Sequence, residues 1–566
     1  FLSRSRRHTS PAPGSWARRC ETAPTHADLQ ADVLVVGGGL GGVAAALAAA
    51  ERGARVVLTE EHPWIGGQLT SQAVPPDESP WVERFGVTAR YRALRDGIRD
   101  VYRRSYPLTD AARTWDALNP GAGWVSKLCH EPRVAVGVLE EMLAPWRSAG
   151  RIRLLERVRP TAATTDGDRV TSVTLTPVTA DAAGAAVTVH AAFVVDATET
   201  GELLPLTGTE YVTGFESNRE TGEPSAPDEA QPDNVQALSV CFAVEHVDGD
   251  HTIDRPERYD FWSTYTPGPW NGRRMLSWEA PNPRTLAMDV RSFTPNPGDD
   301  PRAVDADQSK NPGDGNLWTF RRIAARDLFA PGHYASDLCL VNWPSIDYFL
   351  EPVLDVPRDV EEARIADARQ LSLSMLYWMQ TEAPRADGGT GFPGLRLRPD
   401  VMGSADGLAQ AAYHRESRRL RAVTTVTEND VSYAVRGDRG ATRYDDSVGV
   451  GMYRIDLHPS TGGDTYIDVA STPFEIPLGA LLPQRVTNLL AANKNIGTTH
   501  ITNGCYRLHP VEWNVGEAAG HLAAHCLATG RTPHAVQSKA DLLADYQDEL
   551  VRAGVELRWP AEAHPY

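Results

Sequence analysis

The stretch ADVLVVGGGLGGVAAALAAAERGARVVLTEE, residues 31–61, decides the fold. It begins with a β-branched apolar run, continues through a glycine cluster into an Ala-rich segment, and reaches a second apolar run after Gly53. Short Val-rich runs are typical of buried strands, and a long Ala-rich segment that ends at a glycine is typical of a helix. We therefore predict a βαβ unit and, with it, an α/β fold containing a doubly wound, Rossmann-like domain.

Three glycines of this unit, Gly37, Gly39 and Gly42, match the pattern G-x-G-x-x-G between the first strand and the helix. There the first glycine makes the turn, the second lets the backbone approach a pyrophosphate, and the third lets the helix pack on the strand. Glu60 ends the second strand, where a carboxylate accepts a hydrogen bond from a ribose hydroxyl, and Glu61 is the alternative. The pattern predicts a dinucleotide site rather than a glycine turn without a ligand.

The identity of the dinucleotide depends on whether a second fingerprint follows. The sequence GVGMYR at 449–454 lacks a preceding strand and a following helix, and no other second fingerprint is visible. Enzymes that bind a nicotinamide dinucleotide usually complete the site in the next unit, whereas a discontinuous FAD domain returns to the flavin at its C-terminal end. We therefore expect FAD.

The chain, at 566 residues, is long enough for two or three domains. Apolar residues at helical spacing dominate 81–150, and strands at 151–158, 168–178 and 185–198 follow as a β-meander. Beyond residue 206 Pro, Asp, Trp and Asn become frequent, with one clear helix at 359–382. We predict, in order, a disordered basic extension at 1–30, an FAD-binding domain formed by 31–205 and 471–535, an inserted α+β substrate or cap domain at 206–470, and a helical tail at 536–566.

The composition and charge of the chain exclude some classes of binding partner. The net charge is −18 and no basic stripe interrupts the body of the chain, which argues against nucleic acid. Apolar runs such as 43–50 are far shorter than the roughly 20 residues that span a bilayer, so we expect no membrane partner. The six cysteines form no C-x-x-C pair, which disfavours a disulfide framework or an iron–sulfur site and favours a cytoplasmic location. We expect a small-molecule substrate, and a homodimer is compatible with the sequence.

The segments 30–205 and 470–530 resemble the FAD-dependent oxidoreductases of the glutathione-reductase-like superfamily, in the branch near the fumarate reductase and succinate dehydrogenase flavoproteins. WIGGQLTSQ at 64–72 is similar to that family's second glycine loop, and VVDATETGELLPLTG at 194–208 resembles its returning strand and turn. The likeness implies contacts to the pyrophosphate or flavin from Gly66, Gly67, Gln68, Thr70, Ser71, Asp196, Ala197, Thr198 and Gly201. Many relatives hold a ribityl hydroxyl with an aspartate in the last motif. Here Asn493, Lys494 and Asn495 stand there, and an amide such as Asn495 can still bond a hydroxyl.

The segment TTHITNGCYRLHPVEWNVGEAAGHL, residues 498–522, resembles the family's flavin-contacting C-terminal helix. Pro510 suits the start of a helix, and a helix N-terminus formed by Pro510 through Asn514 would stabilise the N1–C2=O edge of a reduced flavin. His500 and His509 are candidates for a general base or for orienting the substrate, because imidazole titrates near neutrality. Arg507 would clamp a substrate carboxylate or the polar edge of the flavin. The alternative for each is a structural hydrogen bond or ion pair.

Other candidates carry weaker signals. His521 and His525 have the i, i+4 spacing of a zinc motif, but the glutamate that such a motif needs is absent, so we expect no metal site. Cys129 and His130 precede a helix, Tyr413, His414 and Arg415 are similar to a family stretch near the active site, and Trp343 and Tyr348 supply aromatic surface for a substrate pocket or for a core.

We therefore expect an FAD-dependent oxidoreductase of the oxidase or dehydrogenase type. It would transfer a hydride from a small organic substrate to flavin N5, and the electrons would pass to dioxygen or another acceptor. Two alternatives stay open: a flavin monooxygenase that is reduced by NAD(P)H, and a flavin-binding interaction protein without catalysis.

Overall fold

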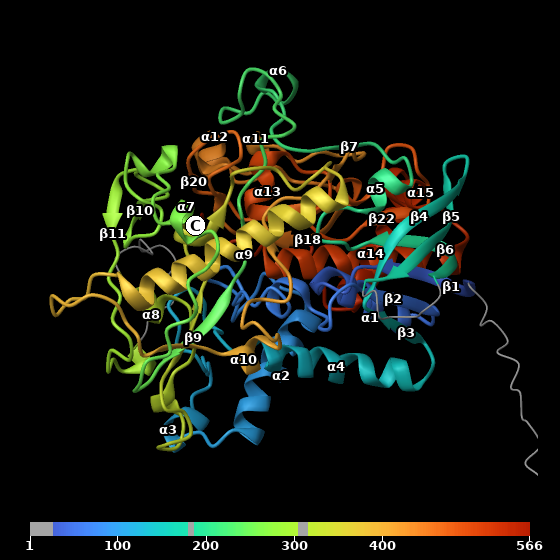
Figure 1. Ribbon diagram of the computed structural model, residues 1–566. Helices are drawn as coiled ribbons and strands as arrows, with labels where there is room; N and C mark the ends of the chain where they lie inside the picture. Colours follow the sequence, from blue (N-terminus) through green and yellow to red (C-terminus); the bar gives the residue numbers. More distant parts are fainter. Residues whose placement is uncertain (1–25, 179–185, 304–314, 566) are drawn as a thin grey trace, which may run out of the picture.

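The computed structural model describes residues 26–178, 186–303 and 315–565. Its main sheet has the strand order β3-β2-β1-β6-β5-β4, and β22 also pairs with β6 (Figure 1). The strands are β1 (His26–Val36), β2 (Val56–Glu60), β3 (Ile152–Glu156), β4 (Val158–Asp166), β5 (Arg169–Pro177), β6 (Ala186–Asp196) and β22 (Leu489–Ala491). The helices of this part are α1 (Leu40–Glu51), α2 (Ala89–Ser105), α4 (Pro132–Ser148), α13 (His500–Tyr506), α14 (His509–Thr529), α15 (Pro533–Ser538) and α16 (Ala540–Arg552).

The parallel part of the sheet corresponds to the predicted βαβ unit. β1 pairs in parallel with β2 and with β6, and β6 pairs in parallel with β22. β1 begins at His26 and already pairs there with Ala186, so residues 26–30 are strand rather than the predicted disordered extension. The rest of that extension, residues 1–25, lies outside the described residues. These parallel strand pairs confirm the prediction of an α/β fold.

The predicted three-stranded meander needs a correction. β4, β5 and β6 do form antiparallel pairs, but β3 pairs in parallel with β2 and belongs to the edge of the parallel sheet. The helical segment between β2 and β3 returns the chain to the starting end of the sheet, so β3 runs in the same direction as β2.

Helices from opposite ends of the chain pack backbone to backbone. A Cβ on Gly516 would overlap the carbonyl of Gly41, and a Cβ on Gly520 would overlap the carbonyl of Ala45, so α14 lies directly against α1. Figure 1 shows α14, in red, beside α1, in blue. The sequence-distant C-terminal segment therefore joins the first βαβ unit, as the discontinuous domain requires.

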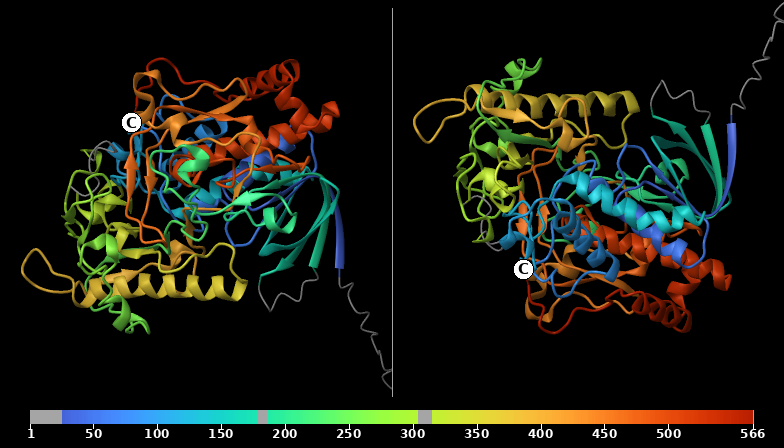
Figure 2. Two further views of the ribbon diagram at one scale, coloured as in Figure 1. Left: turned by 90° about the horizontal axis from the view of Figure 1, so that it is seen from above. Right: turned by 90° about the horizontal axis from the view of Figure 1, so that it is seen from below.

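A second hydrophobic core forms within residues 237–412. The long helix α9 (Arg358–Thr381) packs there, with the sheet β12-β13-β9-β15 beside it. In both views of Figure 2, α9 and the C-terminal helices α15 and α16 lie on opposite sides of the molecule. Many buried residues beyond 413 belong instead to the main core, so the second core is shorter than the predicted 206–470 segment.

The strands of this middle part are β7 (Tyr211–Val212), β8 (Leu238–Ser239), β9 (Phe242–His246), β10 (Glu279–Pro281), β11 (Met288–Val290), β12 (Arg322–Ala324), β13 (Leu338–Val341), β14 (Asp347–Tyr348), β15 (Leu395–Leu397), β16 (Tyr413–His414), β17 (Arg419–Leu420), β18 (Ser447–Gly451), β19 (Ile455–Leu457), β20 (Ile467–Val469) and β21 (Phe474–Pro477).

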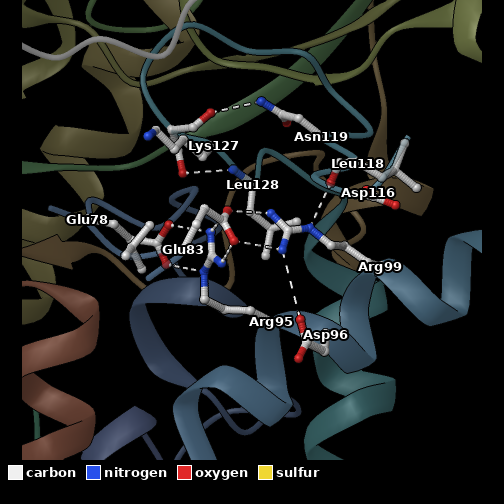
Figure 3. Close-up of polar contacts among 12 residues, drawn as sticks. Glu78, Glu83, Arg95, Asp96, Arg99, Asp116, Leu118, Asn119, Lys127 and Leu128 are labelled. Carbon is white, nitrogen blue, oxygen red and sulfur yellow. Dashed lines mark hydrogen bonds and ion pairs between the residues drawn. The ribbon is translucent and has the colours of Figure 1, made fainter. Parts of the chain in front are cut away.

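A buried ion-pair network holds the loop after the second glycine motif against α2. The Arg95 guanidinium forms paired hydrogen bonds to Glu78, at 2.8 and 3.1 Å, and to Glu83, at 2.9 and 2.8 Å. Arg99 adds bonds to Glu83 at 3.1 and 2.6 Å, and Figure 3 shows the four side chains facing one another. Arg95 and Glu78 are almost fully buried, so this loop has a fixed position.

The helices of the described ranges, α9 and α14 included, all lack the combination of length and apolar character that crossing a membrane requires.

Candidate active site

A cavity of about 280 Å³ opens at the carboxyl ends of the parallel strands. The fingerprint loop from Gly37 to Gly39, the end of β2 and the turn after β6 form one wall, and the first half of α9 forms the opposite wall. In open α/β sheets, ligands bind outside the carboxyl ends of the strands, at the point where the strand order reverses. Here the chain reverses between β1 and β6, so the cavity lies where a dinucleotide is expected.

Each fingerprint glycine meets a close neighbour. Gly37 has a φ of +100°, which favours glycine, and a Cβ there would overlap the Ala197 carbonyl. A Cβ on Gly42 would overlap the Gly37 carbonyl, because the helix packs tightly on the turn. A Cβ on Gly39 would lie 3.0 Å from Glu512 Oε1 and 3.1 Å from Glu199 Oε1. Gly39 therefore lines the cavity with bare backbone, and a side chain there would press against two carboxylates.

The carboxylate predicted to bind a ribose lies in this cavity. Glu60 accepts hydrogen bonds from the backbone N–H of Gly38, at 3.1 Å, and of His62, at 2.7 Å. Burial raises the pKa of Glu60 to about 8, although both bonds oppose the rise. Glu61 also lines the cavity, but it forms an ion pair with Arg358 of α9 at 3.0 Å. Both glutamates line the cavity, but each already has partners within the protein.

The second glycine loop approaches the first one closely. A Cβ on Gly67 would lie 3.0 Å from the Gly39 Cα and 2.7 Å from Glu199 Oε1. Gly66 and Gly67 have φ values of +105° and +49°, so both favour glycine. Thr70 does not line the cavity, because its hydroxyl donates to the Ile65 carbonyl at 2.5 Å. The loop therefore contributes backbone rather than the Thr70 side chain.

Gln68 connects this loop to the C-terminal segment. Its Nε2 donates to the Arg507 carbonyl at 2.9 Å and to the Glu512 carboxylate, and Glu512 in turn accepts from the Gly41 N–H at 3.1 Å. Gln68 Oε1 is buried and has no hydrogen-bond partner among the described residues. A buried acceptor without a donor is what a bound ligand would satisfy.

The returning strand ends in a turn that Asp196 organises. Its carboxylate accepts from Thr198 N at 3.1 Å, from the Thr198 hydroxyl at 2.7 Å and from Leu203 N at 3.2 Å. Ala197 and Thr198 both line the cavity. Gly201 has a φ of +66° and packs against the backbone of Arg418, so it shapes the turn from outside the cavity.

The asparagines of the last motifs are occupied by the protein itself. Asn495 Nδ2 donates to the Asp196 carbonyl at 3.0 Å, and its Oδ1 accepts from Asn493 N at 3.1 Å. Asn514 Nδ2 donates to the Val448 carbonyl at 3.1 Å, whereas its buried Oδ1 has no partner within the described part of the chain. Pro510 is the second residue of α14, close to its expected place.

Lys494 and Glu199 form a buried ion pair in the same region. A Cβ added to Gly39 or to Gly67 would lie close to Glu199 Oε1, so the pair lies where the two glycine loops meet. FAD fits this set of groups. Glu60 or Glu61 would hold a ribose, the backbone of the two loops and Lys494 would hold the pyrophosphate, and Gln68 with the start of α14 would face the flavin.

The two candidate bases occupy different surroundings. His509 Nδ1 accepts from Asp77 N at 3.1 Å, and its Nε2 is 3.2 Å from the Val74 carbonyl, to which it donates. Burial lowers the pKa of His509 to about 3. Both nitrogens are therefore used to fix the loop that contains Val74 and Asp77, which leaves none to accept a substrate proton.

His500 and Arg507 also sit in hydrogen-bonded networks. The His500 ring stacks on Phe215, with centroids 3.7 Å apart, and its Nδ1 is 3.0 Å from Glu416. The Arg507 guanidinium donates to the Tyr413 hydroxyl at 2.7 Å and to Asp456 at 3.2 Å. Neither side chain lines the dinucleotide cavity.

Two further histidines predicted from the sequence bond to other side chains, and the pair Cys129–His130 is buried. His521 is 3.2 Å from Arg90, and His525 is 3.0 Å from Glu549, so the two imidazoles point to different partners. Cys129 and His130 are buried, and burial raises the pKa of the Cys129 thiol to about 12, which disfavours a thiolate.

A second cavity, of about 150 Å³, lies between the second core and the hairpin formed by β19 and β20. Its walls combine aromatic rings with arginines, and Trp343 is one of the rings, whereas Tyr348 packs in the core instead. β16 separates the two cavities: His414 lines the first, and the next residue, Arg415, lines the second. Neighbouring residues of an extended chain point to opposite faces, which explains the separation.

The second cavity contains a histidine that sequence reasoning missed. His458 Nδ1 is 2.6 Å from Asp347 Oδ2, and Asp347 also accepts from Ser239 at 2.6 Å and pairs with Arg415 at 3.0 Å. The sheet β14-β8-β16 explains this arrangement, since Asp347 pairs with Ser239, and Ser239 with Tyr413. Burial opposes ionisation of Asp347, but Arg415 and His458 hold its pKa below the ordinary value.

Comparisons with known proteins give partial matches to curated relatives. The chain is 48% identical over 124 residues to a carotenoid phi-ring synthase of Streptomyces griseus, covering 22% of this chain and 20% of that protein. It is 38% identical over 65 residues to an iron-sulfur component of the CoB–CoM heterodisulfide reductase of Methanopyrus kandleri, covering 11% and 10% of the two chains. It thus spans a fifth or less of the length of these curated relatives. A geranylgeranyl bacteriochlorophyll reductase-like protein of Thermoplasma acidophilum matches 94% of this chain and 85% of its own, at 12% identity and a TM-score of 0.28.

A family model described as FAD dependent oxidoreductase matches residues 32–550, which include both halves of the dinucleotide site. The chain belongs to the FAD-dependent oxidoreductase family, and FAD is its cofactor.

Proposed function

We propose that the protein oxidises a small organic substrate bound in the second cavity. When bound, FAD would supply the redox chemistry, with N5 as the hydride acceptor and dioxygen or another molecule as the final electron acceptor. The proposal is finer than family membership, which covers several types of reaction. It retains the oxidase or dehydrogenase type expected from the sequence.

One observation carries the proposal: His414, the last residue of β16, lines the cofactor cavity, and the next residue, Arg415, lines the second cavity, whose walls are polar and aromatic. An oxidoreductase needs its small-molecule site next to the reactive part of its cofactor. Arg507 supports the connection, because its carbonyl accepts from Gln68 on the cofactor side while its guanidinium bonds Asp456, which lines the second cavity.

We assign proton removal to His458. Oxidation of an alcohol or amine removes an O–H or N–H proton, and a neutral imidazole accepts it. Asp347 fixes the ring through Nδ1, which leaves Nε2 as the acceptor, with Asp456 3.7 Å away. A buried carboxylate behind an imidazole holds the correct tautomer and stabilises the imidazolium. His500 remains a candidate for positioning, since Glu416 holds its ring.

The test is anaerobic reduction of the bound flavin by a panel of alcohols, amines, hydroxy acids and sugars. Replacing His458→Asn should leave FAD bound and slow reduction by about 100-fold or more, because a positioned base contributes about 10²–10⁴-fold. His251→Asn, a partly exposed histidine whose ring contacts a backbone carbonyl of its own loop, is the matched control. Equal rates in wild type and His458→Asn would refute the assignment.

The alternatives predict different results in the same experiment. A monooxygenase would be bleached rapidly by NADPH and not by the organic panel. A flavin-binding interaction protein would be bleached by neither.

A further inference from the structure

We propose that the second cavity recognises an organic carboxylate that carries a single ring, with the carboxylate at Arg321 and Arg415. This inference rests on the proposed function only where it takes the bound ligand to be a substrate of the oxidoreductase. The binding itself follows from unsatisfied groups, charge and size in the cavity.

The first observation is a set of buried polar atoms without partners. Four lining residues contribute donors that find no acceptor among the described residues: Arg321 through Nη1, Arg415 through Nε, Asn342 through Nδ2 and Trp343 through Nε1. The hydroxyl of Tyr466, which can donate or accept, and one acceptor, Asn342 Oδ1, are likewise without partners among the described residues. Buried polar groups in native proteins are nearly always hydrogen-bonded. A cluster made mostly of donors therefore points to a ligand rich in acceptors.

The second observation is the charge of the walls. Arg454 and Arg284 both pair with Asp468, and Arg415 pairs with Asp347. Arg321 donates through Nε to the Asn342 carbonyl at 3.1 Å and forms no ion pair with any described carboxylate. The charge of Arg321 opposes the rise in the pKa of Asp77, but the two side chains form no ion pair, so an anionic ligand would give this half-buried guanidinium a contacting partner.

Arg321 and Arg415 both line the cavity, and each has a buried guanidinium nitrogen without a partner among the described residues. Burial raises the pKa of the Tyr413 phenol, and the charges of both arginines oppose that rise. Burial also raises the pKa of Asp77, and both arginines again act in the opposite direction. Two arginines that line one cavity supply the planar sets of donors that suit a carboxylate.

Size and wall composition define the rest of the ligand. A cavity of about 150 Å³ is the size that accommodates one benzene ring in a protein core. Trp124, Phe320 and Trp343 supply flat apolar surfaces around the cavity. A ring of six atoms with one attached carboxylate therefore satisfies the volume, the aromatic surface and the donors together.

The experiment measures binding of benzoate and of benzyl alcohol, its neutral counterpart, to the holoprotein by titration calorimetry. Benzoate should bind at least tenfold more tightly than benzyl alcohol. Arg321→Gln should remove that preference, and Arg219→Gln, an exposed arginine paired with Glu229, should keep it. Equal binding of the two probes to wild type, or full benzoate affinity in Arg321→Gln, would overturn the proposal. If acetate binds as tightly as benzoate, the part of the proposal that requires a ring is wrong.

A second variant protects the test if Arg321→Gln fails to fold. Asn342→Asp keeps the side-chain shape and adds a negative charge to the cavity wall that Arg321 also lines, so it should weaken benzoate binding at least tenfold and leave benzyl alcohol binding unchanged. Unchanged benzoate affinity would overturn the proposal. Flavin absorbance of the same samples separates the two claims: bound FAD that substrates reduce, without benzoate binding, would refute the carboxylate site and leave the oxidase assignment standing.

Discussion

Glu199 places a carboxylate between two glycine loops that would otherwise present only backbone to a pyrophosphate. Its partner Lys494 is buried. The charge of Glu199 raises the pKa of Glu512 at the start of α14, and the charge of Lys494 opposes that rise. The glycine fingerprint could be predicted from the sequence, because its three glycines lie within six residues of one another and form a local pattern. His458 was not, because its partner Asp347 is 111 residues away and no local pattern connects them.

Replacing Gly39→Val should produce protein without bound flavin. The added side chain would begin 3.0 Å from Glu512 and fill the space that the phosphate needs. Flavin absorbance of the purified protein is the measurement. Gly137→Ala is the control, because a Cβ there meets nothing within 4 Å and alanine suits the interior of α4. Full flavin content in Gly39→Val would refute the assigned site.

Replacing Glu199→Gln should strengthen FAD binding by about tenfold, equivalent to about 1.4 kcal/mol. The change removes a negative charge near the expected pyrophosphate and frees Lys494 to pair with it. Fluorescence titration of the apoprotein with FAD measures the affinity, with Glu229→Gln as the exposed control. Weaker binding by Glu199→Gln would show that the carboxylate contacts the cofactor favourably.

At the scale of elements, the loop that carries the second glycine motif depends on α2. The motif itself could be predicted from its resemblance to a known family, but the Arg95 network could not, since Glu78 and Glu83 look like ordinary loop acids in the sequence. β3 was assigned to the wrong part of the sheet for a similar reason. An apolar pattern predicts a strand, whereas the direction of its neighbour depends on the helices that return the chain.

Arg95→Met should destabilise the protein by about 3–5 kcal/mol, because it leaves the buried Glu78 carboxylate without its partner. Urea denaturation of the apoprotein is the measurement. The exposed pair between Arg104 and Glu141 provides the control, and Arg104→Met should change the free energy of unfolding by less than about 1 kcal/mol. A similar small effect of both variants would contradict the importance of the network.

At the scale of the whole molecule, the fingerprint loop at 37–42 and the start of α14 meet at an acidic site in a chain of net charge −18. Its discontinuous plan was predictable because the flavin-binding motifs lie in both end segments. The second cavity was not predictable, because short strands such as β14 and β16 bring its residues together from distant segments. Two residues of that cavity had been singled out from the sequence, Trp343 by its aromatic character and Arg415 by resemblance to a family stretch.

The acidity of the cofactor cavity predicts a pH dependence. Burial raises the pKa of Glu60 to about 8, and burial with the charge of Glu199 raises that of Glu512 to about 7. A bound pyrophosphate adds negative charge and raises both pKa values further, so FAD binding takes up protons. FAD affinity should therefore fall as the pH rises from about 6 to about 9. Affinity that rises over this range in fluorescence titrations would contradict the assigned surroundings.

The central claim is that this chain holds FAD and uses it to oxidise a small organic molecule. The most direct measurement is the flavin content of the purified full chain, followed by anaerobic titration with the panel of alcohols, amines, hydroxy acids and sugars. We predict about one FAD per chain and bleaching by at least one organic substrate without NAD(P)H. A colourless protein that cannot be reconstituted with FAD, or a flavin that only NADPH reduces, would contradict the account.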